Sequence, residues 1–202
     1  MINKSHLLSA ICGMEKALGT VNSPARKLYN YAQQHFIDGK MPVVFFQTVT
    51  TRTQDTVHLH GLFIGSSSRP FELAAALSQK VNIVHMERRA HKVVTYLDPD
   101  ELKTTWVGNK GIYRTRMAVA DDGELIILAP GVKAFGENEE MDAMTRKYGY
   151  KGRDYILDLY RQGAFDGKAM SAAHLIQGSS DGRFTITYAT RPEYLSKTEI
   201  EN

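Results

Sequence analysis

The chain has 202 residues, and its 43% hydrophobic and 23% charged residues are the ordinary balance of a globular protein with one sizeable core. Its net charge of +3 is too small to indicate nucleic-acid binding, and no apolar run is long enough to span a membrane. The single cysteine, Cys12, excludes an internal disulfide, and residues 1–16 lack the apolar block of a signal peptide, so we expect a soluble cytoplasmic protein.

Two helices are predicted at the start of the chain. Apolar residues recur there at helical spacing: Leu7, Ile11, Met14 and Leu18. Ser5 is the expected N-cap of this first helix, and Gly19 ends it. Ser23 followed by Pro24 predicts the start of the second helix, with serine as the N-cap and proline at the first helical position.

Strand and helix patterns then alternate. Apolar runs predict strands over residues 43–46, 57–64, 81–86, 92–97 and 124–128. The first of these is typical of a buried strand. Helical spacing predicts helices over residues 70–80 and 109–120. This alternation indicates an α/β fold, a Rossmann-like three-layer domain with a largely parallel sheet.

The C-terminal part is predicted to be more helical. Apolar faces indicate helices around residues 141–148 and 156–160, and Ser171 is expected to cap a short helix that ends at Ile176. An alternating strand follows over residues 183–188, and the polar residues 196–202 are expected to fray. No repeat and no linker divides the chain, so we expect one domain over residues 1–202.

The stretch before and within the 109–120 helix carries the strongest signal for a binding site. Lys110, Tyr113 and Arg114 share one face of that helix by their spacing. Their charges, the free backbone N–H groups and the helix dipole favour an anion, so a carboxylate or phosphate site is predicted. The alternative is a solvated basic face that pairs with nearby acids. Trp106 either walls the pocket or fills the core.

Histidines form two further candidate features. His58 and His60 flank Leu59 on a predicted strand, which puts both rings on one face, and imidazole suits zinc or nickel. No third ligand lies at a recognisable spacing, so we predict no metal site. His174 precedes a Gly/Ser loop and is either a helix-end histidine or a polar residue that lines the site.

Several stretches resemble the C-terminal domain of lactate racemase and its 2-hydroxy-acid epimerase relatives. They are Gly123–Val132 with the following Phe135-Gly136-Glu137, Arg146–Tyr150, and Ser23–Arg26, which is similar to an Asn-Pro-x-Arg stretch of the family. The resemblance covers about residues 22–188. Family members use a nickel ion in a pincer-type pyridinium nucleotide, which takes hydride from the substrate's α-carbon and returns it to either face.

The resemblance implies a division of labour between two halves of an enzyme. In the family, the cofactor-tethering lysine, the nickel ligand and the acid/base pair lie in an N-terminal half. We expect that half to be absent from this chain and to be its partner. The isolated chain is then expected to bind no cofactor and to be catalytically inactive.

The resemblance also assigns residues to the substrate side. Lys110 matches the family's substrate-facing lysine, whereas Val107 stands where the family has glutamine, which leaves the hydroxy acid unspecified. Gly108-Asn109-Lys110 looks more like the sugar-acid epimerase relatives. With Lys110 as the catalytic residue, the expected substrate-binding residues are Trp106, Asn109, Tyr113, Arg114, Arg116, His174 and Arg183.

Two alternatives from other classes remain open. One is a non-catalytic module that binds an anionic metabolite. The other is a metal-dependent hydrolase that uses His58 and His60.

Overall fold

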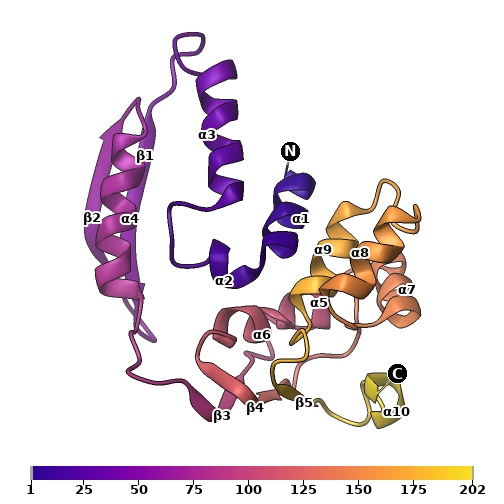
Figure 1. Ribbon diagram of the computed structural model, residues 1–202. Helices are drawn as coiled ribbons and strands as arrows, with labels where there is room; N and C mark the ends of the chain where they lie inside the picture. Colours follow the sequence, from indigo (N-terminus) through magenta and orange to yellow (C-terminus); the bar gives the residue numbers. More distant parts are fainter. Residues whose placement is uncertain (1, 202) are drawn as a thin grey trace. The chain divides into compact units, whose positions relative to one another are not determined.

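The computed structural model describes residues 2–201, which belong to two compact units (Figure 1). The main unit combines the residues up to Leu18 with those from Met86 onward, and the inserted unit is Gly19–His85. The single domain over residues 1–202 stays a prediction. The chain passes between the units at Leu18–Gly19 and His85–Met86, where no Pro-, Gly- or Ser-rich linker marks the boundary.

The main unit is built on a parallel sheet flanked by helices, which confirms the predicted α/β class. Its strands, in spatial order, are β3 (Ala90–Tyr96), β4 (Val119–Leu128) and β5 (Thr185–Ala189). The central strand β4 alternates, so that Leu125 and Ile127 are fully buried. Two short helices, α5 (Thr105–Gly108) and α6 (Lys110–Thr115), follow β3, and α6 contacts both β3 and β4.

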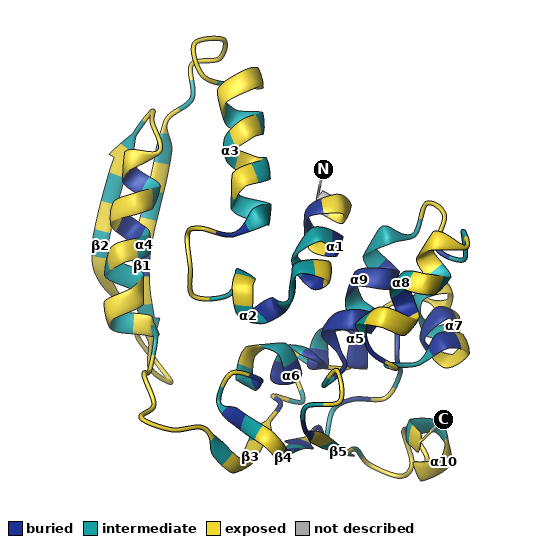
Figure 2. Cartoon of the chain, viewed as in Figure 1, coloured by how far each residue is buried: buried dark blue, intermediate teal, exposed yellow. Residues whose placement is uncertain are grey.

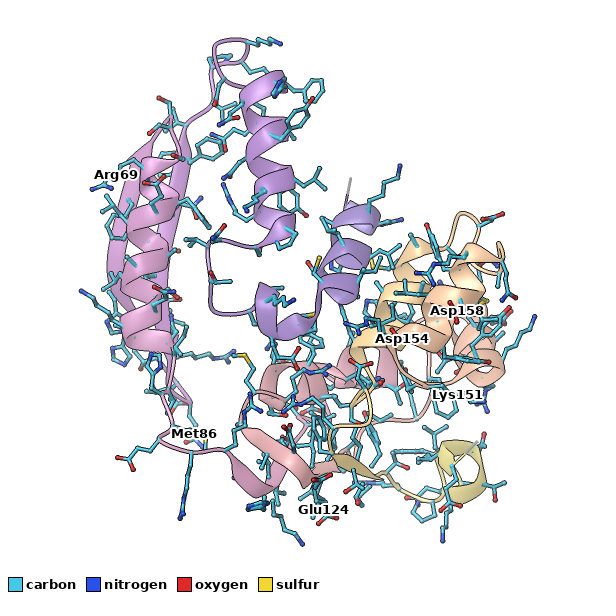
Figure 3. The ribbon with its side chains drawn as sticks, viewed as in Figure 1. Arg69, Met86, Glu124, Lys151, Asp154 and Asp158 are labelled. Carbon is cyan, nitrogen blue, oxygen red and sulfur yellow. The ribbon has the colours of Figure 1, made fainter. Side chains whose placement is uncertain are left out.

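A second core in the main unit lies among helices (Figure 2). These helices are α1 (Ile2–Cys12), α7 (Glu139–Tyr148), α8 (Arg153–Arg161) and α9 (Ala169–Gln177). Helix α1 packs against α9, with Leu7 and Ala10 buried. Helix α8 turns Ile156 into this core and leaves Asp154 and Asp158 exposed (Figure 3). The helical character of the C-terminal part is thus as predicted.

The inserted unit is an antiparallel hairpin with helices. Its elements are α3 (Pro24–Phe36), β1 (Phe45–Arg52), β2 (Val57–Gly65) and α4 (Arg69–Asn82). As predicted, the Ser23 side chain accepts a hydrogen bond from the Arg26 N–H and caps α3. Helix α4 packs on both strands. It approaches closely at Gly61, where a Cβ would lie 2.7 Å from Leu77 Cδ2.

Several predicted boundaries in the first half of the chain differ from the structure. The first helix is interrupted at Gly13, whose φ of 93° suits glycine, and α2 (Met14–Ala17) follows. Ser5 lies buried inside α1 and does not cap it. The strand predicted over residues 43–46 begins only at Phe45, and its Phe46 is exposed rather than buried. Of the strand predicted over residues 81–86, residues 81 and 82 are the end of α4, and residues 83–86 form no strand.

Boundaries in the second half differ for similar reasons. The helix predicted over residues 109–120 is shorter in the structure, because α6 ends at Thr115 and β4 already begins at Val119. Asp122 lies in a bulge within β4 at a φ of 60°. Ser171 lies inside α9 rather than at its cap, and residues 197–201 form helix α10 (Lys197–Glu201). None of the helices formed by residues 2–201 is both long and apolar enough to cross a membrane.

Candidate functional site

The junction of α5 and α6 positions Lys110. Asn109 closes α5, because its N–H donates to the Thr105 carbonyl, and it directly precedes Lys110 at the start of α6. The Asn109 side chain is buried, and a Cβ on Gly178 would lie only 2.3 Å from its Nδ2. Close packing against the Gly178 loop therefore holds this junction, and the role of Asn109 in substrate binding stays a prediction.

Buried phenols lie behind the same junction. Burial raises the pKa of Tyr150 to about 12, although hydrogen bonds with Thr105, Thr145 and Asn109 oppose the rise. The Tyr150 hydroxyl and Thr105 Oγ1 are 2.7 Å apart. Burial also raises the pKa of Tyr188, whose hydroxyl would lie 2.7 Å from a Cβ on Gly108. Both phenols are neutral at physiological pH, so they contribute shape rather than charge, and Tyr150 also contributes hydrogen bonds.

Trp106 and His174 form the central contact of the candidate site. Their rings stack with centroids 3.7 Å apart and planes inclined by 8°. Burial lowers the pKa of His174 to about 4, and the positive charges of His6 and Lys110 lower it further, whereas a hydrogen bond with the Trp106 backbone opposes the shift. The ring is therefore a neutral imidazole at pH 7. Trp106, which stacks on His174, and Lys110, whose charge acts on the His174 ring, thus lie near one another.

His6 joins this group although the sequence analysis does not single it out. It lies on α1, which packs against the α9 helix that carries His174. In the sequence, His6 is one polar residue within the first predicted helix, and only the packing of α1 on α9 brings it near His174. No local pattern reports a contact between helices that are so far apart along the chain.

We expect the half-buried His174 to make folding stability dependent on pH. The unfolded ring takes up a proton below its ordinary pKa of 6.5, whereas the folded ring does so only near 4. The stability from this group is fully present above pH 6.5 and is lost as the pH falls through about 4, a loss of about 2–3 kcal/mol. Urea unfolding of wild type and His174→Gln between pH 4 and 7 measures it. The difference between the unfolding free energies of wild type and His174→Gln should change across this window. The exposed control His91→Gln should show the same pH dependence of unfolding free energy as wild type. The same pH dependence in all three proteins would contradict the prediction.

Arg116 is a structural residue, which corrects its predicted role as a substrate ligand. Its side chain is 3% exposed and donates from Nε to Glu15 at 2.6 Å, from Nη1 to the Ser179 carbonyl at 3.3 Å and from Nη2 to Asp181 at 3.2 Å. These contacts join α2, the end of α6 and the loop after α9. A guanidinium engaged on three sides in this way has no free face for a substrate carboxylate.

Arg183 belongs to the same ionic network. Its guanidinium donates to Glu15 at 3.1 Å, to Asp121 at 2.8 Å and to the Val119 carbonyl at 3.2 Å. Burial tends to raise the pKa of Glu15, but its hydrogen bonds and the charges of Arg116 and Arg183 outweigh burial and lower it. We therefore assign Arg183, like Arg116, to the folded framework rather than to the substrate.

The remaining predicted residues lie on α6. Tyr113 is half-buried and Arg114 is exposed, so both are accessible from solvent. The helix has only six residues, which makes its dipole a smaller attraction for an anion than the predicted 12-residue helix would supply. The charge of Lys110 itself is then the main electrostatic attraction at this site.

The histidine pair of the inserted unit offers no metal centre. His58 and His60 are both exposed, and His60 Nε2 lies 2.7 Å from Thr51 Oγ1. Within residues 2–201, no group of three or more histidine, cysteine, aspartate or glutamate side chains is arranged to hold a metal ion. The hydrolase alternative therefore has no ligand set in the described part of the chain.

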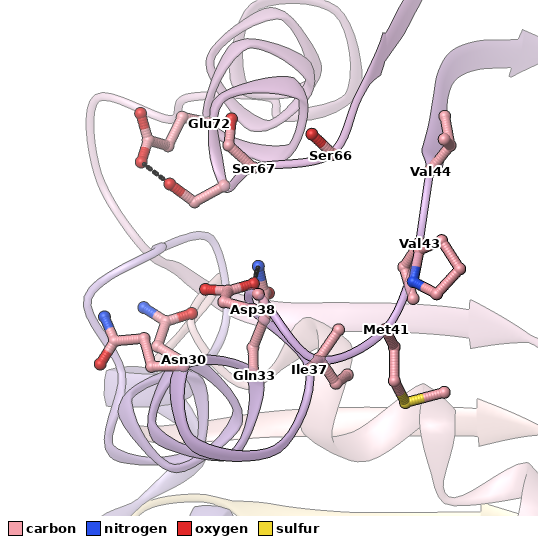
Figure 4. A pocket seen from close by; sticks show the side chains of 14 residues that line it. Asn30, Gln33, Ile37, Asp38, Met41, Val43, Val44, Ser66, Ser67 and Glu72 are labelled. Carbon is pink, nitrogen blue, oxygen red and sulfur yellow. Dashed lines mark hydrogen bonds between the residues drawn. The ribbon is translucent and has the colours of Figure 1, made fainter.

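The inserted unit contains a polar groove of about 770 Å³ (Figure 4). Amides on α3, the serines of residues 66–68 and the carboxylates Asp38 and Glu72 line it. Gln33 donates to Asp38 at 3.3 Å, and Ser68 donates to Glu72 at 2.9 Å. Its described lining carries two acids and no basic residue, so the groove is unsuited to a carboxylate and is separate from the Lys110 site.

Comparison with known proteins supports the fold and leaves the activity open. No protein-family model matches the chain, and no curated protein matches it. A crystal structure of a Thermotoga maritima protein, determined by the Northeast Structural Genomics Consortium, is similar, with a TM-score of 0.78 and 27% sequence identity. The match covers 94% of this chain and 49% of the other, so this chain shares its fold and spans about half its length.

Proposed function

We propose that this chain is the substrate-binding side of a nickel-pincer-dependent racemase or epimerase of 2-hydroxy acids, of the lactate or sugar-acid type. The observation that carries the proposal is the gathering of Lys110, Trp106 and His174. A cation, an aromatic wall and a neutral imidazole lie together there. This combination suits a small hydroxy carboxylate, because it offers a charge for the carboxylate and a neutral partner for the hydroxyl.

Each residue has a distinct role in this proposal. Lys110 binds the carboxylate as a point charge, and Tyr113 and Arg114 add donors from the same helix. The His174 imidazole, neutral at pH 7, exchanges a hydrogen bond with the substrate's hydroxyl. Trp106 excludes water from one side of the acid. Asn109 acts through Lys110, since its buried side chain holds the start of α6.

The proposed cofactor belongs to a partner half rather than to this chain. The part of the chain that the structure describes offers no set of three metal-ligating side chains, and the resemblance puts the cofactor lysine elsewhere. When bound in the complete enzyme, a pincer cofactor supplies the hydride acceptor. The contribution of this chain is to bind and orient the acid. We further propose a cytoplasmic location, in keeping with a free Cys12.

We expect the isolated chain to bind 2-hydroxy acids weakly and to turn none of them over. Calorimetry with lactate, malate, gluconate and mannonate measures binding, and assays with added nickel-pincer cofactor measure turnover. Matched ligands that lack the 2-hydroxyl or carry an amide in place of the carboxylate should bind worse, because each leaves Lys110 or His174 without its partner. Equal binding of inorganic phosphate and the deoxy acids would favour a general anion-binding module. Turnover by the chain alone would contradict the proposal.

A further inference from the structure

The groove of the inserted unit has a polar side and an aliphatic side (Figure 4). Amides, serines and two carboxylates form the polar side, and Met41, Val43 and Val44 lie together on the aliphatic side. All of the described lining belongs to Gly19–His85, so the groove is a feature of one unit. Its volume of about 770 Å³ lies within the usual range of small-molecule sites, about 300–1,000 Å³. A molecule with both polar and apolar surfaces therefore fits this groove in size and chemistry.

The two carboxylates reach the groove from different elements and are held in place by neighbouring side chains. Asp38 follows α3, and Gln33 Nε2 donates to its Oδ1 at 3.3 Å. Glu72 lies on α4, where it accepts from Ser68 at 2.9 Å and pairs with Arg69 at 3.6 Å. Arg69 offsets the charge of Glu72, whereas no ion pair within residues 2–201 offsets Asp38. Both carboxylates keep lone pairs that can accept from a ligand.

Hydrogen-bond donors line the same groove. The Asn30 side-chain oxygen accepts from Arg26 Nε at 2.7 Å, which leaves the Asn30 amide N–H groups as donors. The Ser67 hydroxyl oxygen accepts from the Arg69 N–H at 3.3 Å, so its own proton can be donated to a ligand. Gln34 offers both a donor and an acceptor, and its side chain makes no hydrogen bond to the rest of the described chain. The groove thus presents donors and acceptors next to one another.

This mixture of groups decides which chemical class of ligand suits the groove. An anion would be repelled by Asp38, and an organic cation would leave the amide and hydroxyl donors unused. A hydroxyl group both donates and accepts, so a molecule with several hydroxyls pairs with both kinds of group, and its C–H surface can contact the aliphatic side.

We propose that the groove of the inserted unit binds a neutral polyhydroxylated molecule, a sugar or a sugar alcohol. The proposal is independent of the proposed function, because it concerns a second site with a lining of its own. Asp38 and Glu72 accept from the ligand's hydroxyls, and Asn30, Gln34 and the serines of residues 66–68 donate to them. A free sugar or sugar alcohol, with no carboxylate or phosphate, is the class that this lining fits.

An NMR titration of the isotope-labelled full chain with glucose, mannose, galactose and mannitol tests this site. At least one of them should bind with a Kd of about 1 mM or lower, and the amide shifts should cluster at the groove. Asp38→Ala should weaken that binding about tenfold and Gln34→Ala about threefold, because each removes a hydrogen-bonding partner. Asp55→Ala and Gln54→Ala are matched controls on the loop between β1 and β2, and should bind like wild type. Lys110→Ala should also bind like wild type.

Four results would overturn the proposal. None of the four compounds binds, the shifts lie away from the groove, or Asp38→Ala and Gln34→Ala both bind as tightly as wild type. The fourth is tighter binding of the diamine putrescine than of all four compounds, which would make the groove a site for organic cations. Circular dichroism of each variant verifies that the chain remains folded. No 2-hydroxy acid enters these measurements, so their failure is separate from failure of the proposed function.

Discussion

In the proposed racemase or epimerase, replacing Lys110 by alanine is expected to cost about 2–4 kcal/mol of transition-state stabilisation. The reason is the position of the lysine. Its charge acts on His174, whose ring stacks on Trp106. A carboxylate bound at Lys110 is thereby held beside a neutral imidazole and an aromatic wall, and its α-carbon can be oriented. The measurement is kcat/KM for the best 2-hydroxy acid.

Folding and charge are controlled separately in this experiment. Lys110 is only partly buried, so Lys110→Ala should keep the Tm of wild type within a few degrees. Lys103→Ala removes the same charge from an exposed position before α5 and should leave kcat/KM nearly unchanged. If kcat/KM were unchanged in Lys110→Ala, Lys110 would be a solvated surface residue and would not bind the substrate. A large loss of Tm would instead give it a structural role.

Arg116→Ala is expected to destabilise the chain by about 3–5 kcal/mol, the usual cost of removing one partner from a buried ion pair. The substitution leaves the partly buried carboxylate of Asp181 without its cation, leaves Glu15 with Arg183 alone, and leaves the Ser179 carbonyl without this donor. It also removes the link between α2, α6 and the loop after α9. Urea unfolding at neutral pH measures the change in unfolding free energy.

Arg114→Ala is the matched control for Arg116→Ala. Arg114 lies two residues earlier and is exposed, so its replacement should change the unfolding free energy by less than about 0.5 kcal/mol. The resemblance described above implies that both arginines are substrate ligands. If Arg116→Ala retained wild-type stability and lost substrate binding instead, the structural assignment made here would be wrong.

Local patterns in the sequence determined those features that depend on neighbouring residues. Ser23 and Pro24 predict the start of α3 because an N-cap and a first-turn proline act within one helical turn. Alternation predicts β4 near residues 124–128 because side chains of a strand point to opposite faces every second residue. The α/β class follows from the order of such elements. The sequence predicts an anion-binding site at Lys110 because the spacing of Lys110, Tyr113 and Arg114 puts them on one helix face.

Tertiary structure alone decided how these elements pair and which side chains remain free. An apolar run at residues 43–46 predicts a buried strand, yet Phe46 is exposed, because exposure depends on what packs against a strand. Arg116 and Arg114 carry the same charge two residues apart, but only Arg116 meets Glu15, which lies about one hundred positions earlier. His6 reaches the site through the packing of α1 on α9. Such long-range contacts arise from burial and ion pairing across the whole chain, and no local periodicity encodes them.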